Sequence, residues 1–186
     1  TDQAINIFNS LNGTGVPLNP IEVIVSKTTA NASDRKNFEK RWQEIVQRTD
    51  SSRLDLNSLI THYIFMKLSE QNGADRRNPG IRAFFSKNKY LLNDDILFTA
   101  ELDRLIINFE RVSDTINGQL INQLNGNLRP FVSSYLFFRE DSTYLDYILR
   151  LGILIELSEL SYSHKIFKGF LEEINLMYSQ VDSVST

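Results

Sequence analysis

The residues near the start of the chain that could do chemistry are Gly13 and Gly15, which follow Asn12 in the stretch "NGTG". Glycine adopts positive φ values that other residues avoid, and the backbone amides of such a loop, placed before a helix, can hold a phosphate. No lysine follows the loop as in a P-loop, and no strand precedes it as in a dinucleotide-binding fold. A turn between two helices explains the glycines equally well, so this spacing leaves both a phosphate site and a simple turn open.

Basic residues gather in the stretch "ADRRNPGIRAFFSKNKY" and could contact the phosphates of a nucleic acid. Residues 1–92 hold 13 Lys and Arg against 9 Asp and Glu, and residues 93–186 hold 7 against 14, so the two halves carry +4 and −7. The whole chain is therefore acidic, and a solvated helix surface is the alternative interpretation. DNA affinity at this stretch would be weak and salt-dependent. The candidate nucleic-acid-binding residues are Arg76, Arg77, Arg82, Lys87 and Lys89.

Histidines and paired carboxylates give no sign of a metal or catalytic site. Neither His62 nor His164 has a second ligand at a spacing that zinc sites use. His62 lies between apolar positions of a predicted helix, so we expect it to be partly buried, and we expect His164 on the surface. Adjacent carboxylates such as Asp94 and Asp95 point about 100° apart on a helix, which favours a helix start and a solvated face. No nucleophile stands beside a base, so no catalytic residue is predicted.

The elements that must position these residues are helices, because apolar side chains recur with the helical period almost everywhere. No stretch shows the alternation of a strand, and the predicted fold class is all-α, an irregular multi-helix bundle of seven or eight helices. Two glycines and a proline in "INGQLINQLNGNLRP" predict an interruption between helices. The first expected helix ends near Asn12, the second begins at the cap Asn19 with Pro20, and a short helix begins after Asn78 and Pro79. The other expected helices cover about residues 33–48, 56–68, 93–114, 130–138, 142–160 and 163–180.

The composition is that of one globular domain, with 186 residues, 41% of them hydrophobic, and no cysteine. The most apolar run, residues 147–157, is shorter than the roughly 20 residues of a membrane span and predicts a core helix. No signal peptide is visible, so we expect no membrane association and a cytoplasmic location. The residues expected to be buried are Trp42, Ile60, Leu105, Phe109, Leu149 and Ile153.

The opening stretch "IFNSLNGTGVPLNPIEVIVSK" resembles the pattern Phe-x-x-Leu-Asn-x-x-Gly-x-Pro-Leu of the GmrSD-type restriction endonuclease family, whose N-terminal part is domain of unknown function 262. Looser likenesses follow in "FEKRWQEIV", "LITHYIFMK", "IRAFFSKNKY" and "RPFVSSYLFFRE". Together they cover nearly the whole chain as the helical middle of such a protein. The positions that match the opening pattern are Phe8, Leu11, Asn12, Gly15, Pro17 and Leu18.

The resemblance implies that the chain is a non-catalytic scaffold between nucleotide-handling and nuclease parts of a larger restriction or phage-defence protein. Family members begin with a ParB-like region carrying an Asp-Gly-Gln-Gln-Arg-type motif, and many end with a nuclease domain; this sequence contains neither motif. Asn12, Gly13 and Gly15 would lie at the edge of a nucleotide site. A nucleoside triphosphate and Mg²⁺ are expected only in the full-length protein, and no cofactor is expected in this chain.

The resemblance also divides the chain into a linking segment, residues 1–30, and a helical body, residues 31–186, within a single domain. The chain opens on Thr1, so we expect a cut edge, with the first helix exposing one apolar side to a missing ParB-like domain or to a second copy in a dimer. Further expected partners of the chain are a C-terminal nuclease domain or DNA. The residues on that helix are Ile5, Ile7, Phe8 and Leu11. The alternative function is a free-standing helical protein-interaction module.

Overall fold

The structure is a computed structural model that describes residues 19–51, 54–71, 78–113, 115–124, 128–139, 144–157 and 169. Up to residue 157, the regular structure of these residues consists of eight α-helices and one 3₁₀ helix, which confirms the predicted all-α class and number of helices. The elements are α2 (Pro20–Asn31), α3 (Arg35–Ser51), α4 (Leu56–Ser69), α5 (Ile81–Lys87), the 3₁₀ helix η2 (Lys89–Leu92), α6 (Asp95–Ser113), α7 (Ile116–Gln123), α8 (Arg129–Phe138) and α9 (Leu145–Leu157).

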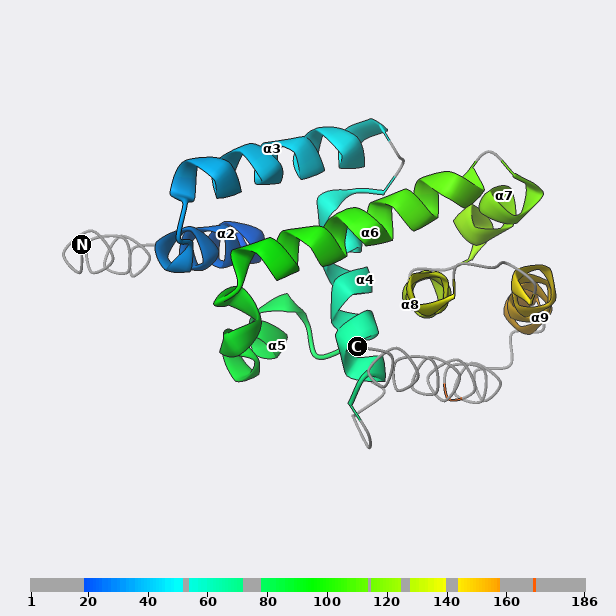
Figure 1. The fold of residues 1–186 in the computed structure, drawn as a ribbon. Coiled ribbons are helices and arrows are strands. Elements are labelled where there is room, and N and C mark those ends of the chain that lie inside the picture. The colour runs from blue at the N-terminus through cyan, green and yellow to red at the C-terminus, as the bar shows by residue number, and fades with distance from the viewer. Residues whose placement is uncertain are drawn as a thin grey trace.

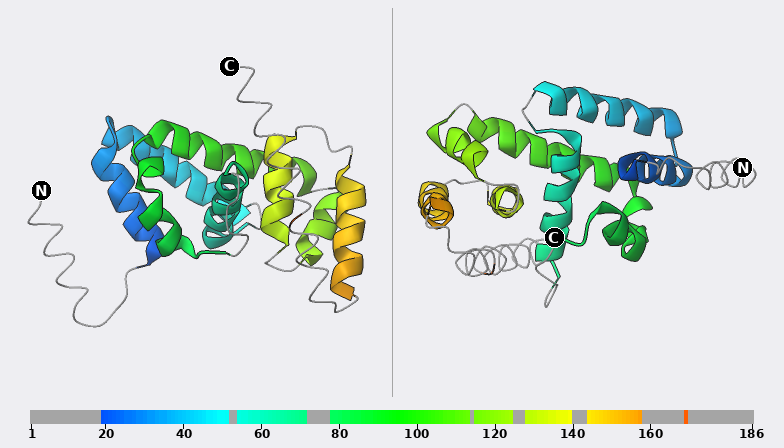
Figure 2. Two further views of the ribbon diagram at one scale, coloured as in Figure 1. Left: turned by 90° about the horizontal axis from the view of Figure 1, so that it is seen from below. Right: turned by 180° about the vertical axis from the view of Figure 1, so that it is seen from behind.

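Helix α6 is the central element, and it packs against α2, α3, α4, α7, α8 and η2. With 19 residues it spans about 28 Å at 1.5 Å per residue. Figure 1 shows α3 running along α6, with α2 and α5 near one end of α6 and α7, α8 and α9 near the other. The two views of Figure 2 show the same separation of the two groups of helices. Helix α6 therefore connects the first helices of the fold to the last ones.

The most extensive helix contact is between α4 and α8. The rings of Phe65 and Phe131 lie 4.6 Å apart between centroids. Small polar side chains allow a close approach farther along, where the hydroxyls of Ser69 and Ser134 share a buried hydrogen bond of 2.8 Å. All described side chains of α8 except that of Arg129 are buried, so α8 is the innermost of the late helices. The core thus lies between α4, α6 and α8.

The start of α2 follows the local sequence as predicted. Asn19 Oδ1 accepts a hydrogen bond of 3.0 Å from the amide of Ile21, Pro20 occupies the first helical position, and Glu22 lies in the first turn. A cap of this kind stabilises a helix by about 1 kcal/mol. Residues 20–30 of the predicted linking segment thus form most of α2, whose buried Ile21 and Ile24 join the common core.

The sequence prediction was wrong at residues 116–123, where α7 stands in place of an interruption. Thr115 caps this helix by accepting a 3.2 Å hydrogen bond from the amide of Gly118. Burial of Ile121 and Leu124 offsets the cost of about 1 kcal/mol that a glycine imposes within a helix. Tertiary packing and a threonine cap therefore outweigh the local effect of the glycine.

The start of α5 also differs from the prediction, because Gly80 and not Asn78 is its N-cap. Gly80 has φ 75°, in the left-handed region that favours glycine, and its amide donates to Asn78 Oδ1 at 2.8 Å. Asn78 and Pro79 therefore form the turn before the helix. The 3₁₀ helix η2, which follows α5, was not predicted either.

Four of the six residues predicted to be buried are buried, namely Ile60, Leu105, Phe109 and Leu149. Trp42 and Ile153 are only partly buried and pack against the edge of the core. The helix predicted as a core helix, α9, buries one face and exposes a second apolar face. None of the described helices is long and apolar enough to cross a membrane.

Candidate functional site

The residues predicted to hold a nucleotide, Asn12, Gly13 and Gly15, lie outside the described residues. The same applies to the apolar residues of the first predicted helix, through which dimerisation is expected, and to Arg76, Arg77 and His164. The predicted helix over 163–180 also falls outside the described part, apart from Gly169. These predictions are neither supported nor opposed by the fold.

Three of the predicted nucleic-acid-binding residues are described, and all three are exposed. Arg82 and Lys87 belong to α5, and Lys89 begins η2. The structure therefore places these three positive charges on one short surface segment, residues 82–89, which we call the α5 basic segment. Because α5 and η2 pack against α2 at the same end of the fold, this segment is far from α9.

If the α5 basic segment binds DNA, reversing the charges of Lys87 and Lys89 should weaken binding and flatten its salt dependence. Each phosphate contact that is lost should reduce the slope of log K against log salt concentration by about 0.9. Titration of labelled duplex DNA with the K87E/K89E variant at several salt concentrations measures both quantities. The matched control is K27E/K36E, which reverses two lysines that are exposed on α2 and α3. Equal losses in the two variants would show only a general effect of charge.

The candidate site that the structure itself presents is a groove between α3 and α6 of about 490 Å³. This volume falls within the range of about 300–1,000 Å³ that is usual for ligand pockets. Its floor contains the buried side chains of Ile45 and Thr99, and Ile96 is exposed at its edge. The lining residues are Arg41, Glu44, Ile45, Gln47, Arg48, Ile96, Thr99, Ala100 and Asp103.

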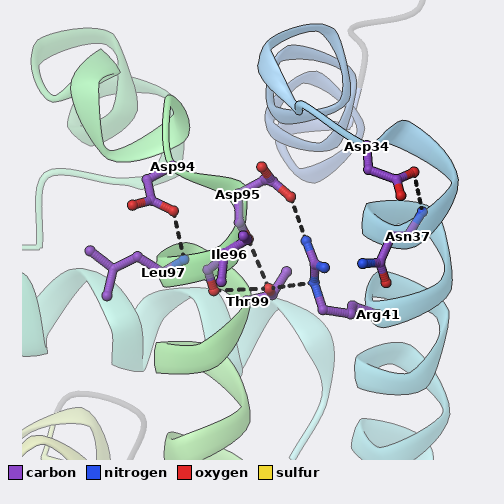
Figure 3. A network of polar contacts seen from close by, with 8 residues as sticks. All are labelled: Asp34, Asn37, Arg41, Asp94, Asp95, Ile96, Leu97 and Thr99. Atoms are coloured by element: carbon purple, nitrogen blue, oxygen red, sulfur yellow. Dashed lines mark hydrogen bonds and ion pairs between the residues drawn. The ribbon is translucent and has the colours of Figure 1, made fainter.

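Arg41 lines the groove, and Figure 3 shows its side chain reaching from α3 towards Asp95 and Thr99 on α6. The guanidinium of Arg41 forms an ion pair with Asp95, and its Nε donates a 3.1 Å hydrogen bond to Thr99 Oγ1. Thr99 Oγ1 in turn donates to the carbonyl oxygen of Asp95 at 2.8 Å. Arg41 therefore joins α3 to two consecutive turns of α6.

Figure 3 also corrects the prediction for the adjacent carboxylates at the start of α6. Asp94 Oδ1 accepts a 2.8 Å hydrogen bond from the amide of Leu97, as expected for a helix start. Asp95, however, is buried rather than solvated, because it faces Arg41. The two carboxylates thus point apart: that of Asp94 caps the start of α6, and that of Asp95 forms an ion pair with Arg41.

About two turns beyond Asp95 on α6, two carboxylates pair with Arg48, which extends from α3. It forms ion pairs with Asp103 and with Glu110, the latter at 2.5 Å. The hydrogen bond from Arg48 to Glu110 raises the pKa of the guanidinium, and the charge of Asp103 adds to this effect against the cost of burial. Arg41 and Arg48 together form what we call the arginine clamps between α3 and α6.

A third charged cluster fastens α4 to α6 and lies outside the groove. Lys67 Nζ contacts Glu101 at 2.5 Å and Glu70 at 3.2 Å, and it lies 5.8 Å from the centre of the Tyr63 ring. Only 9% of the Lys67 side chain and 13% of the Glu101 side chain is exposed. Burial raises the pKa of Glu70, which the charge of Lys67 partly opposes. This cluster is an interhelical ion pair in a largely dry environment.

The arginine and threonine side chains of the groove are already engaged with other polar groups. Both arginines already face carboxylates, and the hydroxyl of Thr99 is engaged by Arg41 and by a backbone carbonyl. The apolar contacts on offer come from Ile96 and Ala100, which are exposed. In the described part of the chain, no group of three or more His, Asp or Glu side chains could hold a metal ion.

The sequence interpretation missed the groove and the arginine clamps, although a partial signal was present. Asp95, Thr99 and Asp103 recur every four residues and so share one face of α6, and Arg41 and Arg48 are seven residues apart on one face of α3. Their partners, however, lie 54 to 62 residues away along the chain. Only the packing of α3 on α6 shows that the two faces meet.

His62 also differs from its prediction, since it is 1% exposed rather than partly buried. Its ring lies 6.4 Å from that of Phe109 on α6, and its Nδ1 atom has no hydrogen-bond partner among the described residues. Burial lowers the pKa of His62 to about 3, and the charge of Arg129 acts in the same direction against that of Asp55. His62 is therefore a neutral core residue.

No protein-family model matches this chain, and no curated protein or solved structure matches it either. The class that the fold defines is an all-α multi-helix bundle. Three of its described polar clusters are interhelical ion pairs that involve α6.

Proposed function

We propose that this chain is the non-catalytic helical portion of a nucleotide-dependent, ParB-like restriction or phage-defence protein. In this role it is a scaffold that holds a nucleotide-handling part and a nuclease part at a fixed separation. The proposal starts from the opening motif, in which Phe8, Asn12, Gly15 and Pro17 match the family pattern. The nucleotide and Mg²⁺ belong to the full-length protein, and its partners are a preceding ParB-like domain and a following nuclease domain or DNA.

The structural observation that supports a scaffold is the convergence of three interhelical ion-pair clusters on α6. Arg41 and Arg48 fasten α3 to α6, and Lys67 fastens α4 to it through Glu101. Partly or largely buried pairs of this kind fix the register of neighbouring helices when their hydrogen bonds are satisfied. A rigid α6 with helices anchored at both ends is what a spacer between two domains requires.

The alternative function is a free-standing helical protein-interaction module. The observation that favours it is the exposed apolar face of α9, because large exposed apolar patches mark interaction sites. The two functions differ in what stands upstream of Thr1 in the gene. An Asp-Gly-Gln-Gln-Arg-like segment within the preceding hundred or so residues supports the scaffold, and an unrelated sequence or a start codon there supports the module.

Activity assays provide the biochemical test. The chain alone, incubated with DNA, nucleoside triphosphates and Mg²⁺ or Mn²⁺, should neither hydrolyse nucleotide nor cut DNA. The natural longer protein should do so, and R41A/R48A within it should lower DNA cleavage while nucleotide binding persists, because α3 loosens from α6. A matched control is K40A/E44A, which removes an exposed ion pair within α3. Turnover by the chain alone that disappears on mutating one of its own residues would refute the proposal.

A further inference from the structure

Helix α9 has two apolar faces, of which one meets the other described helices. Leu145, Ile148 and Leu149 are buried and belong to the common core. The described element against which α9 packs most is α7, and Figure 2 shows α9 at the outer edge of the bundle. A helix that is apolar on both sides is normally covered on both sides. The second face, which we call the α9 outer face, consists of Tyr144, Tyr147, Leu151, Leu154 and Leu157, each 36% to 76% exposed.

The spacing within the α9 outer face is that of a helix-pairing seam. Tyr144, Tyr147, Leu151 and Leu154 are separated by three, four and three residues, which is the alternation of a and d positions in a coiled coil. At 3.6 residues per turn these four side chains fall within an arc of about 80°. The seam is therefore narrow and straight enough to receive one facing helix.

The area of the α9 outer face is sufficient for a dimer of this chain. Given the exposed fractions and side-chain areas of about 150–250 Å², the five side chains offer about 600 Å² per copy. Two copies would then bury about 1,200 Å², at the lower end of stable protein interfaces. Beside the seam, Asp146 and Arg150 neutralise each other at 2.9 Å, so this pair brings no net charge to the contact.

We infer that the α9 outer face binds a second copy of this chain, with the two α9 helices antiparallel. In this register Tyr147 packs against Leu151 of the partner subunit, and Tyr144 packs against Leu154 of the partner subunit. Each aromatic ring thus faces a smaller leucine, and the twofold axis repeats every contact. The surface differs from the N-terminal segment to which the sequence resemblance assigns dimerisation. The inference does not depend on the proposed function.

Sedimentation velocity over a range of protein concentrations tests the dimer. The unaltered chain should dimerise in the micromolar range, and Y147E/L154E should raise the dissociation constant at least tenfold, because it places charges in the seam. Y90E is the matched control, since Tyr90 is 60% exposed on η2 and should leave the dimer intact. Circular dichroism should be unchanged in both variants, because the replaced side chains are exposed in the single chain. Thermal melting should be unchanged at concentrations below the dissociation constant, where the unaltered chain is also monomeric.

Disulfide trapping tests the relative orientation of the two α9 helices. The sequence contains no cysteine, so only the introduced cysteines can crosslink. A mixture of the single variants Y147C and L151C should form a crosslinked heterodimer under mild oxidation, and Y147C alone should crosslink much more slowly. Fast crosslinking of Y147C alone would mean a parallel pair and would overturn the antiparallel register. A chain that stays monomeric at high concentration, or a dimer equally unaffected by Y147E/L154E, would overturn the inference altogether.

Discussion

Replacing Lys67 with Met should lower the free energy of unfolding by about 3–5 kcal/mol, the largest effect that we expect from one substitution. Methionine keeps most of the apolar length of the lysine stem, so little packing is lost. The charge is lost, and Glu101, with 13% of its side chain exposed, then remains in a largely dry site without its cation. Glu70 adds a second negative charge close by. Urea unfolding followed by circular dichroism measures the change.

The double variant K67M/E101Q separates the loss of the ion pair from the loss of packing. With both charges removed, the negative charge that stays in the cluster is that of Glu70, whose side chain is 34% exposed and therefore partly hydrated, so most of the stability lost in K67M should return. A double variant as unstable as K67M would show that the stem of Lys67, and not its charge, holds α4 to α6.

The helices were predictable where local sequence decides the structure. The start of α2 at Asn19 and Pro20 follows from a side-chain cap and a fixed φ, both of which act within three residues. Pro130, in the first turn of α8, allowed the start of that helix to be predicted in the same way. At α5 the prediction placed the cap two residues early, because the positive φ of Gly80 was not recognised as the helix boundary.

The arrangement of the helices was not predictable from the sequence, because it depends on contacts between distant segments. Helix α7 forms despite Gly118 because its apolar side meets α6 and α9. The arginine clamps require α3 to lie on α6, and the period of apolar residues says which face is buried but not against which helix. The exposure of Tyr147 and Leu154 has the same cause, since an apolar run predicts burial without showing what covers it.

His62 should make the fold acid-sensitive in a defined pH window. In the unfolded chain the imidazole has a pKa near 6.5, and in the fold burial lowers that pKa to about 3. Below pH 6.5 the unfolded chain therefore binds a proton that the fold does not, so stability falls as the pH falls from 6.5 towards 3. The contribution of this histidine over the whole window is on the order of 5 kcal/mol, at about 1.4 kcal/mol per pH unit.

The charged groups around His62 also affect how stability depends on pH, so their contribution must be distinguished from that of the imidazole. Arg129 lowers its pKa and Asp55 opposes this, while the ring of Phe109 is neutral. The pKa of Asp55 is itself lowered, first by its hydrogen bonds to Ser58, so Asp55 also destabilises the fold in acid, but only as the pH falls through the lower range of carboxylates. The two contributions thus overlap only at the acidic end.

The variant H62L should remove the loss that His62 causes between pH 6.5 and about 3, and it should leave in place the loss that Asp55 causes at the acidic end of this window. Leucine fills a similar volume against Phe109 and has no proton to bind, so the variant and the original chain should converge in stability near pH 7 apart from small packing differences. Thermal unfolding at half-unit pH steps measures the effect. The imidazole itself can be followed by NMR, because the chain has only two histidines and H164Q assigns the other signal. A His62 signal that titrates near pH 6.5 in the folded chain would mean that its ring reaches water, and the acid window would then have another origin.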